Sequence, residues 1–331
     1  MPDLRRHTPL LILAATAAVL LLMAGVYRAT RPASGLLTAE EARAELEDLA
    51  VRFSAAIENG RDVAPLRGPI EAVVDQRPEL RNGRKLLGQL YAHVGDTAMA
   101  YDEFAAALSI DPEEPMLQNL AGTAAAMLGD ATAAETHHRL AVRQAPDDPA
   151  LRLPLADLLI EQGRWDEARD VLLGALSIRV TLHEANFLLG EVYVGRGQEG
   201  DTALAVGQFE QALAKLPPGK PGSAASRVAY ARRLASYYAE LGEPREAVAV
   251  LDSLPEAARF SPEVLADMAG YLDRQGQAVL AGLQYEIALD REPTNADYAA
   301  LAAEWYERGG DTRAAALMRA RRAEIGPDTP R

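Results

Sequence analysis

The chain of 331 residues contains no cysteine, and this absence excludes disulfide bonds, thiol catalysis and the common cysteine-based zinc sites. The five histidines are too scattered along the sequence to take the place of cysteine as metal ligands. Positive charge is also scarce, because 34 basic residues face 48 acidic residues and leave a formal net charge of -14. A surface of this sign repels phosphate backbones, so we expect no nucleic acid among the partners.

One long hydrophobic run lies at the amino terminus, where residues 9–27 read PLLILAATAAVLLLMAGVY without a charge. At about 1.5 Å of rise per residue, a helix of this length just spans a bilayer core of about 30 Å. No small-x-small cleavage site follows the run at a suitable distance, which favours an uncleaved membrane anchor over a signal peptide. A cleaved signal peptide and a buried helix of a soluble domain are the alternatives.

The orientation of this anchor is only weakly encoded, because Arg5 and Arg6 precede it while Arg28 and Arg31 follow it. A very short tail ahead of a first apolar segment usually stays in the cytoplasm. The excess of arginine over lysine and the abundance of alanine suggest a bacterial protein. We therefore expect a single-pass protein of the bacterial inner membrane with the bulk of its chain in the periplasm.

A period of 34 residues runs through the rest of the chain. Position 20 of every copy is alanine, and position 8 is always glycine or alanine, so both positions keep small side chains. The copies begin at Arg81, Pro115, Pro149, His183, Val228, Pro262 and Ala296. Position 15 is always glycine, the residue that suits a left-handed helix end. These glycines are Gly95, Gly129, Gly163, Gly200, Gly242, Gly276 and Gly310. The fourth copy carries three extra residues between Gly197 and Gly200, so its positions from 15 onward are counted three residues later.

The pattern resembles the tetratricopeptide repeat very closely, as the first copy shows with RNGRKLLGQLYAHVGDTAMAYDEFAAALSIDPEE. The resemblance implies that each copy is a helix, a tight turn and a second helix, and that the first helices line a concave groove for a peptide or helix. We therefore predict an all-α fold, a solenoid of tetratricopeptide-type helical hairpins preceded by a single transmembrane helix. Gly88 should then lie close to Ala100, where the two helices of the first copy cross.

Features outside the copies complete the predicted domain organisation. Thr38 and Glu41 form a capping box that opens a helix, and a second helix is expected from Pro65 to Gln76, as in a degenerate repeat. The sequence PPGKPGS, which starts at Pro217, interrupts the array with a hinge. The predicted order is a short tail (1–8), the transmembrane helix (9–27), a linker (28–37), the cap repeat (38–80), repeats 1–4 (81–217), a Pro/Gly linker (218–227) and repeats 5–7 (228–329).

Motifs associated with chemistry have simpler explanations in this chain. Gly195, Gly197 and Gly200 match G-x-G-x-x-G, but the motif follows a helix rather than a strand, which indicates an expanded repeat turn. His137 and His138 are adjacent and point about 100° apart on a helix, which disfavours a shared metal ion. We therefore expect no catalytic residue, no cofactor and no metal, and we predict that the protein is not an enzyme.

The resemblance also supplies candidate binding residues, because positions 2, 5, 9, 12 and 13 of each copy face the groove in tetratricopeptide proteins. Met127 and Phe187 are the strongest candidates, since exposed apolar side chains in a groove need an explanation. Clamping of a terminal carboxylate is not expected, because Gln89 stands where the family uses asparagine. The full set of candidates is Lys85, Gln89, Asn119, Met127, Asp157, Phe187 and Glu191.

The function predicted from these features is that of a membrane-anchored scaffold or adaptor, which binds partner proteins or peptides in its groove during envelope assembly. A chaperone-like subunit of cytochrome c maturation and a regulatory arm of a membrane enzyme are the alternatives. We predict that Met127→Glu or Phe187→Glu weakens partner capture. Ala168→Leu should disturb folding, because it overpacks a close helix crossing.

Overall fold

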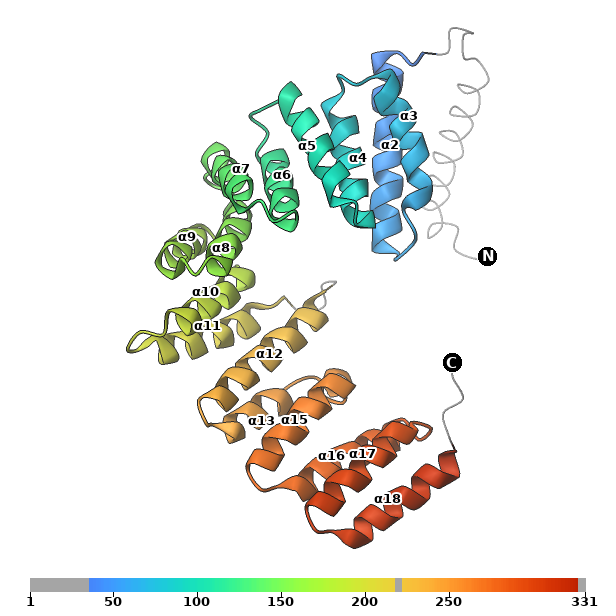
Figure 1. The fold of residues 1–331 in the computed structure, drawn as a ribbon, viewed down its shortest axis with the longest axis vertical. Coiled ribbons are helices and arrows are strands. Elements are labelled where there is room, and N and C mark those ends of the chain that lie inside the picture. The colour runs from blue at the N-terminus through green and yellow to red at the C-terminus, as the bar shows by residue number, and fades with distance from the viewer. Residues whose placement is uncertain (1–35, 218–221, 327–331) are drawn as a thin grey trace, which may run out of the picture. The chain divides into compact units, whose positions relative to one another are not determined.

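The computed structural model of the protein describes residues 36–217 and 222–326, and every regular element in these ranges is a helix (Figure 1). The predicted all-α fold is therefore confirmed. Contacts divide the chain into two compact units, which we call unit 1 (up to Gly129) and unit 2 (from Asp130). The predicted transmembrane helix, residues 9–27, lies outside the described residues, and none of the helices that the structure describes is long and apolar enough to cross a membrane.

Unit 1 begins with the predicted cap. The capping box is confirmed, since Thr38 Oγ1 accepts a hydrogen bond from the N–H of Glu41 and the Glu41 carboxylate accepts one from the N–H of Thr38. The cap is joined to the next helix by Tyr91, whose hydroxyl donates to Glu71 at 2.7 Å and, together with Arg67, lowers the pKa of that carboxyl. The elements are α2 (Ala39–Glu58), the 3₁₀-helix η2 (Ala64–Leu66), α3 (Arg67–Gln76), α4 (Arg81–Val94), α5 (Thr97–Ile110) and α6 (Pro115–Met127).

Unit 2 contains the other described helices. Its elements are α7 (Ala131–Gln144), the 3₁₀-helix η3 (Pro149–Leu151), α8 (Arg152–Glu161), α9 (Trp165–Ile178), α10 (His183–Arg196), α11 (Asp201–Lys215), α12 (Ser223–Glu240), α13 (Pro244–Asp252), α14 (Glu256–Arg259), α15 (Pro262–Arg274), α16 (Ala278–Arg291), α17 (Ala296–Arg308) and α18 (Thr312–Ile325).

Two helices of unit 2 differ from the sequence-based expectation. Residues 223–227 belong to α12 and not to the predicted linker, because the sequence SAASR is rich in helix-forming residues, and the rest of the hinge at 218–221 lies outside the described residues. In the fifth copy, the second helix already ends at Asp252. Pro255 cannot continue the helical hydrogen bonds because it has no N–H, and the short α14 follows it.

Every copy turns at the glycine of position 15. These glycines have positive φ angles between 69° and 88°, a conformation that would strain a larger residue. After three of them, Asp96, Asp130 and Asp311 cap the next helix by accepting a hydrogen bond from a backbone N–H of its first turn. The fourth copy differs, because Gly200 itself takes the capping position and Asp201 lies within α11.

The two helices of a copy cross where the sequence provides small residues. A β-carbon at Gly88 of α4 would lie 3.2 Å from the carbonyl oxygen of Ala100 and 2.6 Å from the ring of Phe104, both on α5. The predicted proximity of Gly88 and Ala100 is therefore confirmed. In the fourth copy, a β-carbon at Gly190 would lie 2.6 Å from the ring of Phe209. Both glycines make room for an aromatic ring that is completely buried.

Packing and turn geometry account for all three glycines of the G-x-G-x-x-G sequence. A β-carbon at Gly195 would collide with the indole ring of Trp165, so only glycine fits at this point of α10. Gly197 and Gly200 have positive φ angles of 60° and 87° and form the two bends of the expanded turn. The motif therefore has a structural explanation in this chain.

An ion pair at a nearly inaccessible carboxylate closes the expanded turn. Asp201 is 2% exposed and accepts hydrogen bonds from the guanidinium of Arg196 at 2.9 and 2.5 Å. It also accepts one from the N–H of Gln198 at 2.9 Å. These hydrogen bonds, above all those from Arg196, hold the pKa of Asp201 below its usual range. Asp201 thus joins the start of α11 to the end of α10 and to Gln198 of the expanded turn.

Candidate functional site

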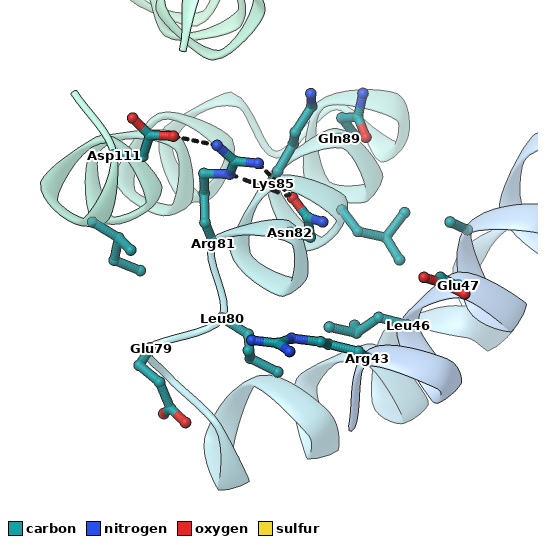
Figure 2. A pocket seen from close by; sticks show the side chains of 13 residues that line it. Arg43, Leu46, Glu47, Glu79, Leu80, Arg81, Asn82, Lys85, Gln89 and Asp111 are labelled. Carbon is teal, nitrogen blue, oxygen red and sulfur yellow. Dashed lines mark hydrogen bonds and ion pairs between the residues drawn. The ribbon is translucent and has the colours of Figure 1, made fainter. Parts of the chain in front are cut away.

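Unit 1 carries a pocket beside α2 and α4, which we call the α2–α4 pocket (Figure 2). Its volume of about 690 Å³ lies within the usual range of ligand pockets. The predicted residues Lys85 and Gln89 both line it. The polar residues of its wall are Arg43, Glu47, Glu79, Arg81, Asn82, Lys85, Gln89 and Asp111.

The pocket residues of α4 follow from the amphipathic pattern of this helix. Leu87 and Leu90 are buried on the side of α4 that packs into unit 1. Asn82, Lys85 and Gln89 are spaced by three and four residues, so they share the opposite side of the helix. Figure 2 shows Lys85 and Gln89 extending side by side from α4.

Ion pairs hold two of the basic side chains in the wall. The ammonium of Lys85 lies 3.2 Å from the carboxylate of Glu114, which precedes α6, and Arg81 pairs with Asp111 at the end of α5. The second carboxylate oxygen of Glu114 is buried and has no hydrogen-bond partner among the described residues. Lys85 and Arg81 therefore fix the start of α4 against its neighbours and shape the pocket.

Three other polar groups of the pocket make no hydrogen bond or ion pair with any described residue. They are the guanidinium of Arg43, the carboxylate of Glu47 and the side-chain amide of Gln89. Apolar side chains, among them Leu46 and Leu80, lie beside them in the wall. An amide both donates and accepts hydrogen bonds, and a guanidinium donates to carbonyl and carboxylate oxygens. The arrangement suits a ligand with polar groups along its length and an apolar side chain.

The other two predicted residues of unit 1 lie on α6, outside the α2–α4 pocket. Asn119 is half-buried, and its backbone carbonyl accepts a hydrogen bond from Thr123 Oγ1 at 3.1 Å. Met127 lies in the last turn of α6 and is 63% exposed. Neither residue joins Lys85 and Gln89 in one pocket, and their contact with a partner stays a prediction.

Two predicted residues of unit 2 already have partners on α12. Glu191 of α10 accepts hydrogen bonds from Arg233 at 2.6 and 3.1 Å. Phe187 stacks on Tyr230, with ring centroids 4.3 Å apart, and is half-buried in the packing of α10 against α12. The expectation of an exposed phenylalanine at this position is therefore wrong. Because Phe187→Glu would disturb this packing, it does not cleanly test partner capture.

Asp157 of α8 differs from these two residues. Its side chain is exposed, yet the surrounding protein raises the pKa of its carboxyl by desolvation. Contact of Asp157 with a partner stays a prediction.

Sequence reasoning missed the α2 side of the pocket. The cap has no repeat motif, so its groove-facing positions were not assigned. A signal was nevertheless present, because Leu46, Leu49 and Phe53 form a helical stripe that the structure buries. Arg43 and Glu47 are exposed, one turn apart, at the edge of that stripe.

The histidine pair lies in α7. His138 is 2% exposed, and burial, followed by the neighbouring His137, lowers its pKa to about 4. It is therefore neutral at pH 7 and belongs to the core. Within residues 36–217 and 222–326, no three or more histidine, aspartate or glutamate side chains are arranged to hold a metal ion.

Comparison with known proteins identifies the class of the repeats. Residues 86–114 and 125–180 match family models of the tetratricopeptide repeat. A tetratricopeptide repeat protein from Parabacteroides merdae has a similar structure, with a TM-score of 0.53 and 14% identity over 78% of this chain and 97% of that chain. The APC/C hetero-tetramer Cut9–Hcn1 gives a TM-score of 0.53 and 18% identity over 81% of this chain and 53% of that chain.

A further solved structure is that of YrrB, described as a tetratricopeptide repeat protein with an unusual peptide-binding site. It has a TM-score of 0.42 and 18% identity over 51% of this chain and 84% of that chain. No curated protein sequence matches the chain. The family matches confirm that the chain contains tetratricopeptide repeats. The chain is thus a helical-repeat protein with tetratricopeptide repeats over the matched residues.

Proposed function

We propose that this scaffold binds a peptide segment of a partner protein in the α2–α4 pocket. The observation that carries the proposal is that Arg43, Glu47 and Gln89 line one pocket and that their polar side-chain atoms lack partners within the described residues. A peptide backbone offers both N–H and C=O groups to such side chains. Leu80 and Ile110, which is 42% exposed, add an apolar surface for one side chain of the peptide.

We also propose that the chain is tethered to a membrane through residues 9–27. The support is the length of this apolar run, which matches a bilayer core, and the absence of charge within it. On this proposal the protein is a single-pass protein of a bacterial inner membrane with its repeats in the periplasm, where it holds partners during envelope assembly. Its role is binding, and we assign no catalytic step to it.

Capture of the partner by the full chain in detergent tests the pocket. Arg43→Glu should lower recovery of the partner about tenfold, because it removes the only unpaired cation in the pocket wall among the described residues. Arg61→Glu is the matched control, since Arg61 is also exposed and undergoes the same change of charge outside the pocket. Circular dichroism of both variants checks that helicity is retained. Equal capture of the partner by the two variants would show that the pocket is not part of the binding surface.

Extraction of membranes with alkaline carbonate tests the anchor. The full chain should stay in the membrane pellet. Val19→Arg places a charge in the middle of the apolar run, which costs about 2.5 to 3.5 kcal/mol in a bilayer, and should release the chain. Release of the unchanged chain by carbonate would contradict anchoring without affecting the pocket.

A further inference from the structure

The outer side of α18 exposes an apolar stripe. Ala315 and Met318 are buried and attach α18 to α17. On the other side, Leu317 is 57% exposed. Three alanines are exposed with it, and at about 100° per residue the four side chains share an arc of about 120°. We call this set, Ala316, Leu317, Ala320 and Ala323, the α18 stripe.

A charged residue stands at each end of the α18 stripe. Arg313 lies in the first turn of α18 and Glu324 in the last turn, and both are exposed. Neither makes a hydrogen bond or ion pair with a residue in the described part of the chain. The helix dipole favours the opposite arrangement, with the acid at the start and the base at the end. The stability of α18 itself therefore does not explain these two charges.

The arginines that flank the α18 stripe are used within the protein. Arg319 pairs with Glu307 of α17, and Arg321 pairs with Asp290 of α16 at 2.9 Å. Their charges are thus neutralised on both sides of the stripe. Arg313 and Glu324 differ from them, because they lie at the two ends of the stripe and have no such partner within the described residues.

We propose that the α18 stripe binds a second copy of the chain, with the two α18 helices antiparallel about a two-fold axis. In this arrangement Arg313 of one copy faces Glu324 of the other. The two-fold axis repeats this ion pair, so one pair lies at each end of the contact. Leu317 of one copy then lies opposite Ala320 of the other. The alanines allow the two helices to approach closely. The same surface on both copies is complementary to itself, which a two-fold contact requires.

The contact area that the α18 stripe offers is small. A single pair of helices buries less than the roughly 1,200 Å² of a standard interface. The association is therefore expected to be reversible rather than obligate. This proposal does not depend on the α2–α4 pocket.

Disulfide cross-linking of the full chain in detergent tests the proposal. Because the chain has no cysteine, every disulfide reports on the thiols that are introduced. Two differently tagged variants, Leu317→Cys and Ala320→Cys, should form a mixed disulfide when they are mixed and oxidised. Val180→Cys is the control, since Val180 is 67% exposed and lies outside the stripe. Cross-linking at the control level, as expected if α18 is free or binds another protein, would overturn the proposal.

Charge reversal distinguishes the proposed contact from unspecific collision. Arg313→Glu or Glu324→Arg alone should lower the yield of the mixed disulfide about tenfold, because each change turns two attractive pairs into repulsive ones. Combining both changes should restore the yield. Each single change places a charge at the helix end that the dipole prefers, so a lower yield cannot come from unfolding of α18. An unchanged disulfide yield in the single variants would contradict the arrangement. So would a double variant whose yield stays low.

Discussion

The ring of Phe104 occupies the space that a side chain at Gly88 would need, and Phe209 stands in the same relation to Gly190. In both copies a glycine on the first helix is matched by a buried phenylalanine on the second helix. The size of one residue therefore sets the size of the other at the helix crossing.

Gly88→Ala should lower the free energy of unfolding of unit 1 by about 1 to 3 kcal/mol, because the new methyl group overlaps the ring of Phe104. Phe104→Leu in the same chain should recover part of this loss. The third copy shows this combination, with Ala156 at position 8 and Leu172 at position 24, both buried. Denaturant unfolding of the single and double variants measures the coupling. Strictly additive effects would show that the two positions do not compete for space.

Acid should destabilise the protein through His138. Its pKa of about 4 in the folded chain lies below the ordinary value of 6.5, so protonation favours the unfolded chain. The contribution of neutral His138 to the free energy of unfolding is fully present above pH 6.5. It decreases as the pH falls toward 4, by up to about 3 kcal/mol. His138→Leu should flatten this dependence in urea unfolding between pH 7.5 and pH 5, whereas replacement of the exposed His93 should not. Equal slopes for the parent and His138→Leu would refute the assignment.

The expanded turn should depend on Asp201 and not on Asp166. Both carboxylates contact Arg196, but Asp201 is 2% exposed, whereas the side chain of Asp166 is 64% exposed. Asp201→Ala should therefore lower the melting temperature clearly, and Asp166→Ala should change it little. Because the pKa of Asp201 is lowered in the folded chain, its contribution is present above the ordinary aspartate pKa and is lost at lower pH. Similar melting temperatures for both variants would contradict this role.

Ala168→Leu should destabilise unit 2 by about 1 to 3 kcal/mol, because Ala168 is completely buried on α9. Ala203→Leu provides the matched control, since Ala203 is exposed on α11 and a surface change there should stay within about 0.5 kcal/mol. Thermal unfolding of the two variants compares the positions directly. If Ala168→Leu had the same melting temperature as the unchanged protein, the repeat register assigned to the third copy would be wrong.

The fold could be predicted because its main requirements are local and steric. Small residues at the crossing, such as Gly88, and glycines with positive φ recur at fixed spacing, so one register predicts all the hairpins. The binding residues have no such constraint. Phe187 was misjudged because its partner Tyr230 lies on α12, beyond the interruption of the repeats. Arg43 was missed because the cap keeps the helical pattern but not the repeat motif.

Photo-cross-linking from the pocket tests the central claim most directly. A photoreactive residue at Gln89, in the α2–α4 pocket, is compared with one at Val51, which is 68% exposed on α2 outside the pocket. The account predicts that one partner protein is cross-linked in cells from position 89 and not from position 51, and that Arg43→Glu abolishes the cross-link. Equal cross-linking from both positions, or none from position 89, would contradict it.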